Sequence, residues 1–303
     1  MSTVETPRLA LRDRNLALKL LTNPVGAFST VMVTLFVVLA VFANQIAPYD
    51  PRKSNYDALK QLPSKQHWMG TDDLGRDILS RMIFGARFTL LGALLALTIA
   101  ILIGCTLGLL AGYFGGFWDA FGNWFSNILQ ALPGLVVLLA AASVVGNGLY
   151  LAMTIFGVLL SPAFFRLMFV TVRAVRNELY VDAARVSGLG DFKIIMRHVL
   201  GVVRAPIIIQ AGIMASIAIA IQAGLQFLGF GDVDSISWGT LLMDGYTKIW
   251  EQPIRLLWPA IGIALLMISL VLFATMLRDE LERVGARVRT STKKSLEEHV
   301  KQE

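Results

Sequence analysis

The feature that most constrains this chain is a series of long apolar runs, because a helix that spans a bilayer needs about 20 mostly apolar residues. About six runs meet that length, and they cover residues 25–46, 88–112, 127–146, 149–170, 206–230 and 256–277. Only 16% of the chain is charged, against about a quarter of a soluble domain. The runs predict an all-α, polytopic membrane protein with about six transmembrane helices.

Lysine and arginine near the ends of the runs indicate the orientation of the chain, because cytoplasmic loops carry an excess of them. They are concentrated in segments 1–24, 171–205 and 278–303, which six spans place on one side. We therefore expect both termini to be cytoplasmic. Segment 47–87 is also basic, yet six spans place it outside, where its aspartates offset much of the charge. The net charge of +6 thus reflects topology and not binding to nucleic acid.

The second run carries small residues at every fourth position. They are Gly92, Ala96, Ala100, Gly104, Gly108, Gly112 and Gly116. Small residues at this spacing let helix backbones approach closely in lipid. We expect the stripe to pack tightly against one or more neighbouring helices.

The chain carries little of the chemistry that would power transport by itself. Every aspartate and glutamate falls outside the six runs, whereas ion-coupled carriers usually keep an ionisable group within the membrane. Arg166 is the only charge well inside a run, and its long side chain can reach toward the cytoplasmic end of its helix. This pattern disfavours a secondary carrier.

The sequence also offers no site for a nucleotide or a metal. It contains no G-x-x-x-x-G-K-[ST] motif, which cradles the phosphates of ATP. His67, His198 and His299 are too scattered for a metal site, and we expect them at the surface. We therefore predict no catalytic residue, no metal and no cofactor in this chain, so its energy must come from a partner unless transport is passive.

A polar, helix-prone loop at 176–204 separates the fourth and fifth runs. Its pattern predicts two short helices, with Gly188 ending the first and Asp191 capping the second. An apolar face on the second helix is expected from spacings of three and four residues, and it comprises Phe192, Ile195, Met196 and Val199. Such a pair could lay this face into a groove on a soluble partner, or it could be a connector resting on the lipid surface.

The stretch "DAARVSG", which contains Asp182, Ala183, Ala184 and Gly188, resembles the E-A-A-x-x-x-G loop of ABC importer permeases. The resemblance implies that this loop docks on the ATPase subunit, where the alanines allow close seating and the glycine permits a sharp turn. Asp182 replaces the usual glutamate, and Gly201 stands where that family usually has a proline. Both departures bear on the strength of docking.

A second stretch, "GTDDLGRDILSRMIFGAR" at 70–87, resembles C-type permeases of the peptide/nickel importer group, as do "IAPYDP", "AGYFGG", "FLGFG" and "SWGTLL". The signature residues are Gly70, Thr71, Asp72, Gly75, Arg76 and Asp77. Arg76 can pair with Asp72 or Asp73, or Asp72 can cap a helix. The segment could lie near a docked binding protein, or it could only hold the outer end of the fold together.

Candidate pathway residues are the neutral polar side chains in the spans. They are Asn127, Gln130, Gln222 and Gln226. They could line a water-filled route or bond to neighbouring helices. Asn127 stands where the group often has aspartate, and Gln222 where it often has glutamate. A route with fewer charges would suit a neutral solute better than a zwitterionic peptide.

The resemblance implies a type I ABC importer permease fold in a bacterial cell membrane, with a core transmembrane domain at 88–277 and an external or interfacial loop at 47–87. It also implies several partners: a homologous B-type permease, two cytoplasmic ATPases that bind ATP and magnesium, and an external solute-binding protein. The expected solute is a dipeptide or oligopeptide. Alternatives are a nickel complex, an opine or an oligosaccharide in the same fold, an exporter or scaffold, or a passive channel or secondary carrier.

Overall fold

The computed structural model describes residues 22–145, 148–230 and 235–302, and within them it contains helices and loops but no strand. Five helical segments are long and apolar enough to cross a membrane, or six if one bent pair counts as a span. The prediction of an all-α protein with about six spans is confirmed. The five segments are α2 (Pro24–Val41), α4 (Ile78–Phe114), α7 (Leu149–Arg176), Asp191–Phe227 and the first part of α12 (Ile254–Gln302).

The predicted run at 127–146 is not one helix. It is divided between α5 (Gly116–Ala131) and α6 (Gly134–Val145), whose axes are bent by 79°. Leu132 at the break has extended backbone angles, because the ring of Pro133 disfavours a helical conformation in the residue before it. The expectation of one continuous span here is therefore wrong.

Helix α4 begins about ten residues before the predicted run and has 37 residues. The side chain of Asp77 caps it by accepting a hydrogen bond from the Ser80 amide. Asp72 does not cap a helix, so that alternative is wrong. At 1.5 Å per residue α4 is about 55 Å long, well beyond the hydrocarbon core of about 30 Å.

The small-residue stripe packs α4 tightly against its neighbours, chiefly α7, as predicted. Its buried members are Gly92, Ala96, Ala100, Gly104, Gly108 and Gly112. A Cβ atom on Gly104 would lie 2.3 Å from the carbonyl oxygen of Ser161, and one on Gly108 would lie 2.6 Å from that of Phe165. Gly116 is an exception, because it begins α5 and no atom lies within 4 Å of its ideal Cβ position.

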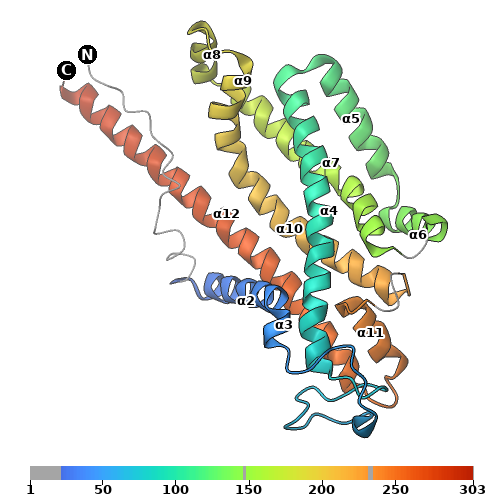
Figure 1. Cartoon of the computed structure of the whole chain (residues 1–303). Helices are drawn as coiled ribbons and strands as arrows, with labels where there is room; N and C mark the ends of the chain where they lie inside the picture. Colours follow the sequence, from blue (N-terminus) through green and yellow to red (C-terminus); the bar gives the residue numbers. More distant parts are fainter. Residues whose placement is uncertain (1–21, 146–147, 231–234, 303) are drawn as a thin grey trace.

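The long helices place two sets of short elements at opposite ends of the molecule (Figure 1). One end holds α8 (Leu179–Val186) and α9 (Asp191–Ile194), and the far end of α12 extends toward it. The other end holds α3 (Ala43–Ile46), α11 (Trp238–Thr247) and the loop before α4. Helix α12 continues to Gln302, so the segment expected as a tail from 278 prolongs the last span.

Candidate functional site

The loop at 176–204 folds into two short helices around a glycine, as predicted. Gly188 has φ of +81°, the left-handed region that favours glycine. The Leu189 amide donates to the Ala184 carbonyl and the Gly188 amide to that of Arg185, which is the Schellman pattern of helix ends. Gly188 therefore sets the angle between α8 and the following chain.

The second helix departs from the prediction. Its N-cap is Gly190, so the expectation that Asp191 caps it is wrong. The Asp191 carboxylate instead accepts a hydrogen bond of 2.6 Å from the Tyr113 hydroxyl at the end of α4. A π-helical segment, Ile195–Val199, joins α9 directly to α10 (Leu200–Phe227).

The inner faces of this helix pair pack on the ends of the spans. Val181, Ala184, Ile194 and Val199 belong to one buried apolar cluster with Tyr113 and residues of α7 and α10. Ala184 consequently faces the chain itself, whereas Asp182 and Ala183 are exposed. The Asp182 carboxylate lies 3.3 Å from the guanidinium of Arg185.

The outer faces of the pair present large apolar side chains. The exposed fractions are 85% for Leu179, 91% for Val186, 74% for Phe192 and 54% for Met196. Val199 is buried, so the predicted face does not include it. Our sequence reasoning did not find Leu179 and Val186, although their spacing of seven residues places them on one face of α8. A patch of exposed apolar side chains marks an interaction surface.

At the opposite end, the signature segment at 70–87 is built around Asp72. Its carboxylate accepts bonds from Arg76 Nε at 2.6 Å and from the Arg76 amide at 2.9 Å, and it pairs with Arg81. The predicted pairing of Asp72 with Arg76 is confirmed. Burial alone would raise the pKa of Asp72, but the Arg76 amide and the two guanidinium groups outweigh it and lower the pKa.

Neighbouring signature residues also fix the conformation of this segment. Thr71 Oγ1 donates to the Ala58 carbonyl. Gly75 has φ of +72°, and a Cβ atom there would lie 1.8 Å from the Asn55 carbonyl oxygen. These contacts tie the loop to itself and explain the requirement for glycine at this turn.

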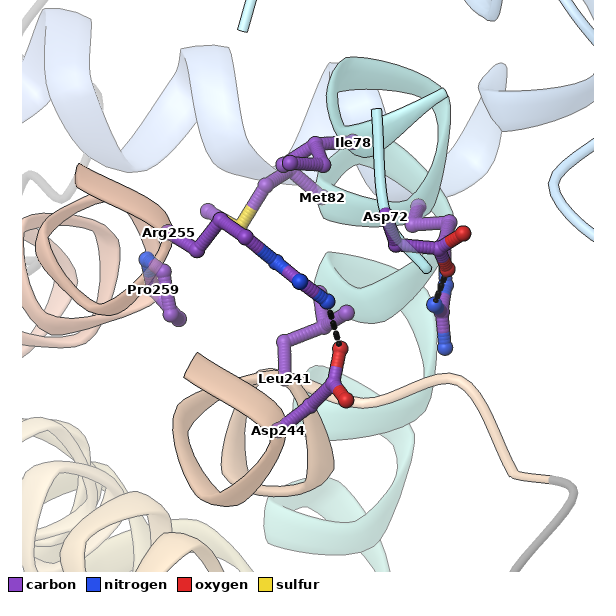
Figure 2. Close-up of a pocket in the computed structure, with 8 residues that line it drawn as sticks. Asp72, Ile78, Met82, Leu241, Asp244, Arg255 and Pro259 are labelled. Carbon is purple, nitrogen blue, oxygen red and sulfur yellow. Dashed lines mark hydrogen bonds and ion pairs between the residues drawn. The ribbon is translucent and has the colours of Figure 1, made fainter. Parts of the chain in front are cut away.

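A further set of ion pairs fastens the loop to α11 and α12. The Arg255 guanidinium lies 2.8 Å from Asp244 and 3.4 Å from Asp73, and its side chain is only 4% exposed. Figure 2 shows Arg255 in direct contact with Asp244, and both residues line a cavity of about 10 Å³ together with Asp72. Lys60 adds a pair with Glu251. Sequence reasoning missed this cluster, because its members are about 180 residues apart along the chain.

His67 was expected at the surface, and that expectation is wrong. Its side chain is 9% exposed, and Nδ1 lies 2.9 Å from the Asp77 carboxylate. The contact fastens the loop before α4 to the residue that caps α4. The described residues contain no group of three or more side chains that could hold a metal ion.

The candidate pathway residues separate into two kinds. Gln222 and Gln226 are at most 1% exposed. Gln222 donates to the Phe88 carbonyl at 3.3 Å, which favours the packing alternative for Gln222. The buried amide atoms of Gln226 have no hydrogen-bond partner among the described residues. Asn127 and Gln130 are exposed on α5, where a route or a second subunit could reach them.

Apolar spans with an ion-paired segment at one end and exposed apolar side chains at the other are those of a multi-pass membrane protein. Residues 104–284 match the family described as binding-protein-dependent transport system inner membrane component. Residues 14–63 match the N-terminal TM domain of oligopeptide transport permease C. The chain therefore belongs to the family of binding-protein-dependent inner membrane components, the permease subunits of ABC importers.

Individual relatives agree with this assignment. Glutathione transport system permease protein GsiD of Escherichia coli O1:K1 / APEC is 34% identical over 259 residues, which cover 84% of each chain. GsiD of Shigella flexneri serotype 5b (strain 8401) is 35% identical over 259 residues with the same coverage. The aligned length shows that the similarity extends over most of the chain.

Proposed function

We propose that this permease forms half of a translocation pathway for a peptide or related small solute, beside a homologous B-type subunit. The observation that carries the proposal is the α8–α9 pair, which presents Leu179, Val186 and Phe192 outside the apolar spans. Side chains of this kind suit a groove on a soluble partner. The similarity to the glutathione permeases supports a peptide-type solute, because glutathione is itself a tripeptide.

The partner at this surface is a pair of cytoplasmic ATPases that bind ATP and magnesium, since this sequence has no motif of its own for ATP phosphates. Asp182, Ala183, Gly188 and the exposed apolar side chains form the contact, and Ala184 and Asp191 hold the pair on the spans. This places both termini in the cytoplasm. The opposite end, with the ion pairs of Asp72, faces an external solute-binding protein.

Docking transmits work to the spans because α8 and α9 share a buried cluster with α4, α7 and α10. Closure of the ATPase pair displaces the helix pair, and the cluster carries that displacement to the span ends. The pathway then alternates between its inward-open and outward-open forms. No residue of this chain takes part in bond chemistry.

Gly188→Val tests the proposal in the assembled transporter, with Gly190→Val as a matched control. Valine at φ of +81° is strained by roughly 1–2 kcal/mol, whereas Gly190 has φ of −69° and open space around its Cβ position. We expect Gly188→Val to lower solute-stimulated ATPase activity and uptake at least about tenfold. Gly190→Val should keep both near the wild-type level.

Membrane insertion should be unchanged in both variants, as judged by the amount of chain recovered in the membrane fraction. Wild-type ATPase stimulation in Gly188→Val, at normal recovery of the chain, would contradict docking through this loop.

A further inference from the structure

An exposed polar seam runs along α5 and α7, and it begins at the end of these helices near α8. There the Arg173 guanidinium lies 3.7 Å from the Asp119 carboxylate. About two helical turns deeper, Arg166 donates to Asn127 Oδ1 at 3.5 Å. Both Arg166 and Asn127 are exposed, and α5 lies along an outer edge of the molecule (Figure 1).

Arg166 is deep within the span. It precedes the end of α7 at Arg176 by ten residues, or about 15 Å of helix. Asn127 follows the start of α5 at Gly116 by a similar distance. The guanidinium thus contacts α5 within the span. The expectation that it can reach toward the cytoplasmic end of its helix stays a prediction.

Among the described side chains no carboxylate forms an ion pair with Arg166, in contrast to Arg173. An unpaired charge within a span is costly against lipid, and such side chains almost always face the bundle interior or a water-filled cavity. The exposed Arg166–Asn127 pair therefore fits a position on the solute route or against another subunit.

We infer that Arg166 is a specificity-determining contact that attracts a side-chain carboxylate of the passing solute. The inference rests on the proposed peptide import. A guanidinium binds carboxylates through paired, charge-assisted hydrogen bonds, and Asn127 leaves it free to do so because an amide carries no charge. The route thus favours anionic solutes, in contrast to the neutral solute that its uncharged side chains suggested.

Uptake by the complete transporter in proteoliposomes tests this inference with two probes, tri-alanine and the peptide Ala-Glu-Ala, which carries one more carboxylate. Arg166→Gln removes the charge, and Asn127→Asp neutralises it in place. Each variant should lower the initial rate for Ala-Glu-Ala about tenfold and that for tri-alanine less than about twofold. Arg166→Lys should retain most of the wild-type preference. Arg204→Gln, on the exposed surface of α10, is the control and should change neither rate.

Equal effects on both probes, or no effect on either, would overturn the inference. If Arg166 instead meets a carboxylate of the neighbouring permease, Arg166→Gln will reduce recovery of that subunit and lower both rates alike, which also overturns it. If the wild type carries neither peptide, the proposed peptide import is contradicted. If the wild type carries both peptides and the Arg166 variants do not discriminate between them, only the role given to Arg166 fails.

Discussion

Single residues in this chain gain their roles from partners that are distant in the sequence. Gln222 and Gln226 are polar residues in a span, and their composition alone leaves open whether they line a route. The structure buries both, with Gln222 beside Gly92 of α4 and Gln226 beside Gly239 of α11. A spacing of four residues puts the two on one face of a helix. That spacing does not show that the face turns inward, because this depends on which helices pack against it.

Asp72 should be the most sensitive carboxylate of the signature segment. Its side chain is 2% exposed and pairs with two guanidinium groups, and removal of one member of a buried pair costs about 3 kcal/mol. We expect Asp72→Asn to destabilise the permease by about that amount in thermal unfolding of the detergent-solubilised chain. Asp57→Asn, at an exposed position, is the matched control and should have little effect.

The stabilisation by Asp72 should also depend on pH. Because the folded state lowers the pKa of Asp72 below its ordinary value of 3.8, the ionised form stabilises the fold at pH values above 3.8. That contribution is lost as the pH falls through the lower, folded pKa. The difference in stability between wild type and Asp72→Asn should therefore be full at neutral pH and vanish in strong acid. A difference that grows on acidification would contradict the assignment.

At the scale of elements, the sequence predicts helices better than it predicts their ends and bends. The six apolar runs correspond to five long helical segments and one bent pair of helices. The agreement is good because the length and hydropathy of a run indicate whether it can cross the lipid. The early start of α4 at Ile78 depends on Asp77 as a cap, which lies in a polar stretch outside the apolar run. Pro133 indicates a bend after Leu132. The residues on both sides of it are apolar, however, and their hydropathy predicts one unbroken span.

Helices α4 and α7 pack closely because small residues of α4 face the backbone of α7. Gly108→Leu would force a side chain against the Met168 side chain and the Phe165 carbonyl, since a Cβ atom alone would lie 2.6 Å from Met168 Cβ and from the Phe165 oxygen. Overpacking of this kind costs about 3 kcal/mol, so we expect a marked loss of folded chain in the membrane fraction. Gly224→Leu on α10 has no atom within 4 Å of the new Cβ position and should be tolerated. Equal yields of the two variants would contradict tight packing at Gly108.

At the scale of the whole molecule, the two ends of the chain carry different kinds of surface. Spacing in the loop predicted a helix pair there, and the position of Gly188 was predicted correctly. The ion-paired end was recognised only as a motif, because Arg255 and Asp244 approach Asp73 through the fold and not along the chain. The exposed surfaces of α5 and α7 were the least predictable part, since exposure there depends on which sides of the helices remain uncovered.

Introducing a charge into the docking surface should separate assembly from folding. Val186 is 91% exposed, so Val186→Glu removes no packing within the chain. An apolar groove on the ATPase would then have to bury an unpaired carboxylate, which is costly. We expect ATPase recovery in pull-down with the tagged permease to fall at least about tenfold. Leu62→Glu makes the same change at the opposite end, where Leu62 is 67% exposed, and should leave ATPase recovery unaltered.

Continuity between α9 and the fifth span has a mechanical consequence. Residues Asp191–Phe227 form one helical segment of 37 residues, about 55 Å long, with a π-helical turn at Ile195–Val199 and Pro206 inside α10. Helices bend at prolines and at π-helical turns. A shift imposed at Asp191 is therefore shared between movement of the whole segment and bending at these two places.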